Sequence, residues 1–186
     1  REGWLGNEEF LREQIKATVN ALFALIGRTN SDITSKDHVL VSNIFEYAWQ
    51  QGRDLTLEKL IMQVQQPPFE RLGVLPVDDY LKERDRYKLA MELNGLVASP
   101  SFKAWTTGQP LDIQKMLYQP SGRPRVSIFY TAHLNESERM FFMTLLLEHI
   151  ISWMRKQSGT TSLRAILYID ELFGYFPPHP FNPPSK

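Results

Sequence analysis

Two short runs of strand-forming residues, separated by one long apolar stretch, constrain the fold of this chain more than any other feature. Residues 126–130 read VSIFY and follow a turn-forming segment that contains Gly122 and Pro124. Residues 165–169 read AILYI, and such an uninterrupted apolar run is typical of a strand buried on both faces of a parallel sheet. We therefore predict two strands that belong to one parallel sheet.

The stretch between these two strands has the marks of a well-bounded helix. Asn135 and Glu138 have the spacing of a capping box, and Arg155 and Lys156 suit the negative end of the helix dipole. Apolar residues occur on most sides of this helix, and we expect His149 to be packed among them. Strand, helix and strand form a βαβ unit, whose crossover is almost always right-handed.

The first 120 residues show helical periodicity, without convincing strand alternation and without an internal repeat. We predict four longer helices and two short ones, at about residues 7–27, 35–51, 57–65, 79–97, 99–105 and 112–118. The predicted fold class is therefore α+β and mostly α. Residues 1–120 form a helical subdomain, and residues 121–186 form part of a parallel α/β core.

The composition excludes some classes of site and leaves others open. The chain has 21 Lys and Arg against 21 Asp and Glu, so its overall field gives no support to a dedicated nucleic-acid or membrane surface. It has no cysteine, which excludes disulfides and thiolate metal sites and fits a cytoplasmic protein. The longest apolar stretch, residues 140–154, is interrupted by Glu148 and is too short for a membrane span of about 20 residues.

The start of the chain bears on its completeness. It begins with Arg1 rather than methionine, and no basic and then apolar leader follows. We expect these 186 residues to be a segment of a longer protein.

Two carboxylates follow the second predicted strand. Asp170 and Glu171 come directly after residues 165–169, and ligands of open parallel sheets bind beyond the carboxyl ends of the strands. An acid in this place can hold Mg²⁺ directly or through water, and a second acid can orient or deprotonate a water. From the pattern alone, the alternative that the strand ends in two solvated acids before a turn stays open.

Longer strings of the sequence resemble one family. LRAILYIDELFGYFPP, followed by NPPSK, resembles the Walker B region of HerA/FtsK-like P-loop ATPases, in particular a bacterial group of HerA-like ATP-binding proteins. The strings QQPPFERLGVLPVDDY, LVASPSFKAW, GQPLDIQKMLY and PRVSIFYTAHLNESERMFFMTLLLEHIISWMR are similar to that group as well. The resemblance spans most of the chain from about residue 35 onward.

This resemblance implies a RecA-like sheet and a role for each acid. Asp170 would hold the magnesium of MgATP through a water, and Glu171 would polarise the attacking water. It also implies a hexameric homo-oligomer that acts on DNA. A phosphate-binding loop needs a Gly-Lys-Ser/Thr turn, yet no Gly-Lys pair occurs in this sequence. We therefore expect the chain by itself neither to bind nor to hydrolyse ATP.

Two alternative functions compete with this interpretation. The chain could be a helical interaction or regulatory module whose acidic strand end has no chemical role. A metal-dependent hydrolase complete in this chain is disfavoured, because side chains of adjacent strand residues point to opposite faces and no third ligand is evident.

Other candidate residues are explained better by structural roles than by functional ones. His133 follows the first strand and could approach a nucleotide, but it has no partner at metal-ligand spacing. Arg123 and Arg125 fit a solvated strand entrance better than a phosphate contact. Three tryptophans are expected in the core or at an interface rather than as base-stacking platforms: Trp49, Trp105 and Trp153.

Overall fold

The computed structural model describes residues 5–28, 34–99, 102, 105 and 107–170. The chain divides into two compact units, Arg1–Gly108 (unit 1) and Gln109–Lys186 (unit 2). The short helix at residues 112–118 therefore belongs to unit 2. Among the described residues, no helix is both long enough and apolar enough to cross a membrane.

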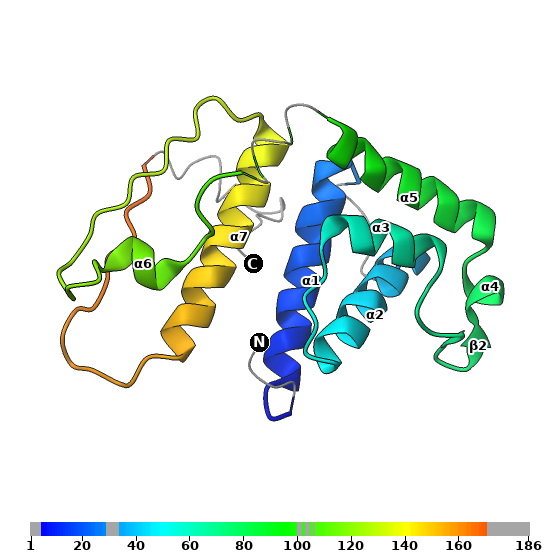
Figure 1. Ribbon diagram of the computed structural model, residues 1–186, viewed down its shortest axis with the longest axis horizontal. Coiled ribbons are helices and arrows are strands. Elements are labelled where there is room, and N and C mark those ends of the chain that lie inside the picture. Colours follow the sequence, from blue (N-terminus) through cyan, green and yellow to red (C-terminus); the bar gives the residue numbers. More distant parts are fainter. Residues whose placement is uncertain (1–4, 29–33, 100–101, 103–104, 106, 171–186) are drawn as a thin grey trace, which may run out of the picture. The chain divides into compact units, whose positions relative to one another are not determined.

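Unit 1 is mainly helical, as Figure 1 shows. Its elements are α1 (Glu8–Leu25), α2 (Lys36–Gln50), α3 (Leu57–Gln65), β1 (Arg71–Leu72), β2 (Leu75–Pro76), α4 (Val77–Tyr80) and α5 (Glu83–Ala98). Ser35 caps α2 by accepting from the His38 backbone N–H, and Thr56 caps α3 by accepting from that of Lys59. The first three predicted helices are confirmed.

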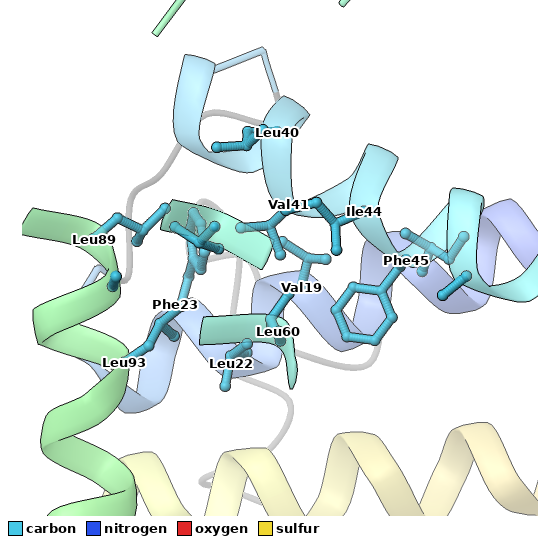
Figure 2. Close-up of a cluster of buried hydrophobic side chains, with 14 of the residues drawn as sticks. Val19, Leu22, Phe23, Leu40, Val41, Ile44, Phe45, Leu60, Leu89 and Leu93 are labelled. Carbon is cyan, nitrogen blue, oxygen red and sulfur yellow. The ribbon is translucent and has the colours of Figure 1, made fainter. Parts of the chain in front are cut away.

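The core of unit 1 gathers apolar side chains from α1, α2, α3 and α5. Figure 2 shows them pointing toward one another from these helices. Its largest fully buried members are Val19, Phe23, Leu40, Val41, Ile44, Leu60, Val64, Leu89 and Leu93. At about 25 cal/mol per Å² of apolar surface removed from water, this cluster supplies the main stabilisation of the unit.

The prediction of one helix over residues 79–97 is wrong, because the chain forms α4, turns at Leu81 and Lys82, and then forms α5. Arg86 explains the break. Its side chain is buried in the first turns of α5, donates to the Leu81 carbonyl at 2.7 Å and pairs with Asp78 at 2.6 Å. A buried guanidinium needs such acceptors, and the turn supplies them.

The prediction that the first 120 residues lack strands is wrong on a small scale. β1 and β2 pair antiparallel, Arg71 with Pro76 and Leu72 with Leu75. Gly73 in the connecting turn has a φ of 58°, which glycine adopts at no steric cost. Each strand has two residues, too few for an alternating pattern to appear in the sequence.

Unit 2 contains α6 (Ile113–Leu117) and α7 (Glu136–Arg155), and both predicted helices are confirmed. Asn135 and Glu138 form the expected capping box. Ile113, Leu146 and Trp153 form the buried centre of this unit, and the Trp153 indole N–H donates to Gln114 at 2.7 Å. The short helix predicted at residues 99–105 lies largely outside the described residues.

The fold class is confirmed at the level of a mostly helical α+β chain, and the sheet of the described residues is the antiparallel β1–β2 pair. Residues 126–130 and 165–169 are not assigned as strands. Strand-forming composition favours an extended chain, but a strand is defined by the ladder it makes with a neighbour.

Candidate functional site

The first of the two predicted strands, residues 126–130, is an extended segment that unit 2 holds at its start. The Arg125 backbone N–H donates to the Leu117 carbonyl at 2.8 Å, and the Ser127 hydroxyl donates to the Met116 carbonyl at 2.8 Å. Further along, the ring of Phe129 lies 5.2 Å from that of Phe142 on α7, centroid to centroid. One side of the segment thus contacts the two helices.

The second predicted strand, residues 165–169, is anchored just before it begins. The Tyr118 hydroxyl donates to the Arg164 carbonyl at 2.9 Å, and the Arg164 guanidinium donates to the Gln157 side chain at 3.2 Å. In Figure 1 residues 126–130 and 165–169 run in the same direction, opposite to that of α7. This is the chain path of a βαβ crossover, although no ladder joins the two segments among the described residues.

The apolar side chains of both segments alternate in exposure. Val126, Ile128 and Tyr130 are 85, 88 and 74% exposed, whereas Phe129 between them is 41% exposed. Ile166 and Tyr168 are 74 and 81% exposed, and Leu167 between them is 46% exposed. A period of two is that of an extended segment with one less exposed face and one bare face. The sequence could not reveal the bare face, because apolar residues occupy both.

Only one of the two acids of the candidate site belongs to the described part of the chain. Asp170 is exposed at the end of the second segment, and Glu171 lies outside the described residues. No group of three His, Cys, Asp or Glu side chains that could hold a metal occurs within the described part of the chain.

The other candidates near the two strands have local partners. His133 is exposed, and its ring stacks on that of Tyr130 at 6.2 Å and 24°. The Arg125 guanidinium donates to the Lys115 carbonyl at 2.9 Å, and the Arg123 carbonyl accepts from the Gln119 backbone N–H at 2.8 Å. These contacts close the loop between α6 and the first segment, and the side-chain bond gives Arg125 a structural role.

The expectation for His149 is wrong. It is exposed on α7, and its Nδ1 lies 2.8 Å from the Leu145 carbonyl one turn earlier. Trp49 and Trp153 are buried, which agrees with the prediction of core residues. The ring centroids of Trp153 and Tyr118 are 6.5 Å apart.

One buried histidine was missed by sequence reasoning. His38 on α2 is 4% exposed, with its Nε2 2.9 Å from the Asn20 side-chain oxygen and its Nδ1 3.2 Å from the Ser42 hydroxyl. The edge of its ring meets Phe23. The spacing of His38 and Ser42, one helical turn apart, was the available signal, but Asn20 is brought in only by the packing of α1 on α2.

Comparisons with protein-family models, with curated proteins and with solved structures found no match to this chain.

Proposed function

We propose that this chain contributes the helical insertion and the Walker B βαβ unit of a HerA/FtsK-like P-loop ATPase, an oligomeric motor whose substrate is DNA. The observation that carries the proposal is Asp170 at the end of an extended apolar segment, with Glu171 next in sequence. The sequence resemblance to that family supplies the roles of the two residues. The common direction of residues 126–130 and 165–169 along α7 supports the same topology.

In this proposal the two acids act on different partners. Asp170 would hold magnesium through a water, and Glu171 would accept a proton from the attacking water. Bound MgATP would supply the phosphoryl group and the cation that neutralises its charge. The bare apolar side of the two segments fits a sheet that is covered on both faces, as parallel sheets generally are.

The first test uses the longer protein that contains this chain. Glu171→Gln keeps the size of the side chain but removes the proton acceptor, so we expect hydrolysis to fall by about 10²-fold or more while nucleotide binding is retained. Nucleotide binding is measured by equilibrium titration and hydrolysis by phosphate release. Loss of binding in Glu171→Gln would show that the role assigned to this residue is wrong.

The 186-residue chain provides the matching negative prediction. It has no Gly-Lys pair to cradle the phosphates, so we expect no magnesium-dependent ATP turnover. Turnover that disappears in Glu171→Gln would contradict the assignment of the phosphate site to another part of the protein.

A second candidate, a helical interaction module, is favoured by the closed core of unit 1. Eighteen buried apolar residues of unit 1 form that core. The coding sequence on either side separates the two candidates: a Gly-Lys-Ser/Thr turn upstream supports the ATPase, and its absence leaves the interaction module.

A further inference from the structure

The even balance of charge in this chain conceals an uneven distribution within unit 2. The chain has 21 Lys and Arg against 21 Asp and Glu, yet residues 113–125 and 153–164 contain no acid. These two stretches contain six cations: Lys115, Arg123, Arg125, Arg155, Lys156 and Arg164. Because the stretches are far apart in the sequence, only the fold can make one surface of them.

Contacts within unit 2 bring the two stretches together. The Tyr118 hydroxyl donates to the Arg164 carbonyl at 2.9 Å, and the Trp153 indole N–H donates to the Gln114 side chain at 2.7 Å. In Figure 1, α6, the C-terminal end of α7 and the starts of the two extended segments lie at the same end of unit 2. We name this joint surface of the two stretches the basic end.

The acids of unit 2 lie mainly away from the basic end. Asp112, directly before the first stretch, pairs with Lys115 at 3.2 Å, and Glu148 lies two helical turns before Arg155. The other acids in the described part of unit 2 are Glu136, Glu138 and Asp170. In Figure 1 the first turn of α7 and the end of the second segment lie at the opposite end of the unit. With Asp112 and Glu148 counted, cations still outnumber acids by six to two at the basic end, so its field is positive.

The dipole of α7 explains only part of this charge. Arg155 and Lys156 complement the negative end of that dipole. The other cations come from α6, the loop after it and the start of the second segment: Lys115, Arg123, Arg125 and Arg164. The sequence alone indicates a solvated strand entrance for Arg123 and Arg125, because it does not show which distant cations share their surface.

The fold orients two of the arginines and leaves donors for a ligand. A guanidinium has five N–H donors in a planar fork. The Arg125 guanidinium donates to the Lys115 carbonyl at 2.9 Å, and the Arg164 guanidinium donates to the Gln157 side chain at 3.2 Å, each through one nitrogen. The other nitrogens can meet the oxygens of a phosphate group, which arginine binds through two parallel hydrogen bonds.

The side chains among the cations indicate which polyanion fits. The exposed ones are mainly hydroxyls and amides: Gln114, Gln119, Ser121, Ser158, Thr160, Thr161 and Ser162. Protein interfaces have an apolar or aromatic centre, whereas surfaces that contact a nucleic-acid backbone are polar and positive, and use hydroxyls and amides besides Arg and Lys. The rings of Tyr118 and Trp153 pack against each other rather than offering a platform for bases. A double helix, which presents its phosphates outward, therefore fits better than a single strand.

We propose that the basic end of unit 2 binds the phosphate backbone of double-stranded nucleic acid without reading its sequence. The biological role of this contact rests on the proposed function, in which the substrate of the motor is DNA. The contact lies at the end of unit 2 away from Asp170, so duplex and nucleotide would be bound at separate places.

Titration of the 186-residue chain into a fluorescent DNA duplex of about 20 base pairs, followed by anisotropy, tests the surface. We expect two duplexes of unrelated sequence to bind equally well. Each phosphate contact contributes about −0.9 to the slope of log K against log salt, so a surface of about four to six contacts should give a slope of about −4 to −5.

The decisive variant is Arg123→Ser. Arg123 takes part in its loop through its backbone carbonyl, so the change of side chain leaves that bond in place. We expect the affinity to fall about five- to tenfold at about 100 mM salt, and the slope to become shallower by about 0.9. Arg123→Lys keeps the charge and should restore most of the affinity, which a defect of folding would not allow.

The matched control removes the same charge at the opposite end of unit 2. Arg139 is exposed in the first turn of α7, and Arg139→Ser should leave affinity and slope close to those of the original chain. Equal effects of Arg123→Ser and Arg139→Ser would overturn the proposal. The same conclusion would follow from a lack of duplex binding at about 50 mM salt, or from tighter binding of a single strand, polyglutamate or anionic lipid vesicles than of the duplex.

The assay contains no nucleotide, which keeps this proposal separable from the ATPase function. Absent duplex binding together with the expected behaviour of Glu171→Gln in the longer protein would reject the basic end alone. Duplex binding at the basic end, together with a longer protein that does not hydrolyse ATP, would reject the ATPase and retain the surface.

Discussion

Unit 1 and unit 2 bury their apolar residues to very different extents. In unit 1, Phe23, Ile44 and Leu93 are fully buried at the meeting point of four helices (Figure 2). In unit 2, Val126 and Ile128 are at least 85% exposed along an extended segment. Both units contain many apolar side chains, so composition does not explain the contrast.

The difference lies in how each kind of backbone is satisfied. A helix makes most of its backbone hydrogen bonds within itself, so it needs a neighbour only to cover its apolar side chains. An extended segment needs a neighbour for its backbone as well as cover for its side chains. The helices of unit 1 bury their apolar side chains against one another. Among the described residues, the two extended segments of unit 2 have neither a full set of backbone hydrogen-bond partners nor full cover for their side chains.

The largest expected effect is in the core of unit 1. Leu93→Ala removes a fully buried side chain of α5 and should lower the free energy of unfolding of unit 1 by about 2–5 kcal/mol. Met91→Ala, at a 50% exposed position of the same helix, is the matched control and should change it by less than about 0.5 kcal/mol. Hydrogen exchange followed by mass spectrometry reports each unit separately. Equal effects of the two variants would contradict the assigned core.

A matched variant in unit 2 sharpens the comparison. Leu146 on α7 is 4% exposed, but its buried partners among the described residues are few: Ile113 and Trp153. Leu146→Ala should lower the free energy of unfolding of unit 2 by less than Leu93→Ala lowers that of unit 1. The reason is that a small cluster can collapse more readily around the missing volume. A larger loss of unfolding free energy in Leu146→Ala than in Leu93→Ala would mean that unit 2 has the more rigid core.

Helix boundaries were predictable from the sequence because local side chains fix them. Asn135 caps α7 as predicted, and Thr56, which stands directly before the predicted helix at residues 57–65, caps α3. The break between α4 and α5 was not predictable in this way, because the Arg86 guanidinium takes the Leu81 carbonyl only once the chain has folded back. Local sequence specifies helix ends well and says little about tertiary acceptors.

The candidate site was predictable to a different degree. The position of Asp170 after an extended apolar segment follows from the sequence, since VSIFY and AILYI both favour extended chain. The bare face was not predictable, because Ile166 and Leu167 are equally apolar and only their packing distinguishes them. Which elements cover a segment is a property of tertiary structure.

The capping box of α7 gives the next largest effect. Asn135→Ala removes the acceptor of the Glu138 backbone N–H, which lies 2.9 Å from the Asn135 side-chain oxygen. The free energy of unfolding of unit 2 should fall by about 1 kcal/mol. Asn135→Asp keeps an acceptor at the cap and should retain most of the stability. Hydrogen exchange in the first turn of α7 measures both variants, and equal exchange in Asn135→Ala and the original chain would contradict the cap.

The smallest expected effect is the pH dependence of the α6 cap. The Asp112 carboxylate accepts from the Lys115 backbone N–H, and that bond, with a further contribution from the Lys115 side chain, holds the pKa of Asp112 below its ordinary value. A lowered pKa means that the folded state favours the carboxylate. The stabilisation is therefore present above the ordinary pKa and is lost as the pH falls through the lowered one, below about pH 4. Asp112 is at the surface, so solvent screens this contribution strongly.

Asp112→Asn separates this titration from other effects of acid, because the amide oxygen can still cap α6 but does not titrate between pH 6 and pH 3. Hydrogen exchange in α6, corrected for the intrinsic effect of pH, should increase toward pH 3 in the original chain and increase less in Asp112→Asn. The same increase in both would assign the acid sensitivity of α6 to other groups. A smaller increase in the variant would show that even the incompletely covered unit 2 has local structure fixed by one side chain and its neighbouring turn.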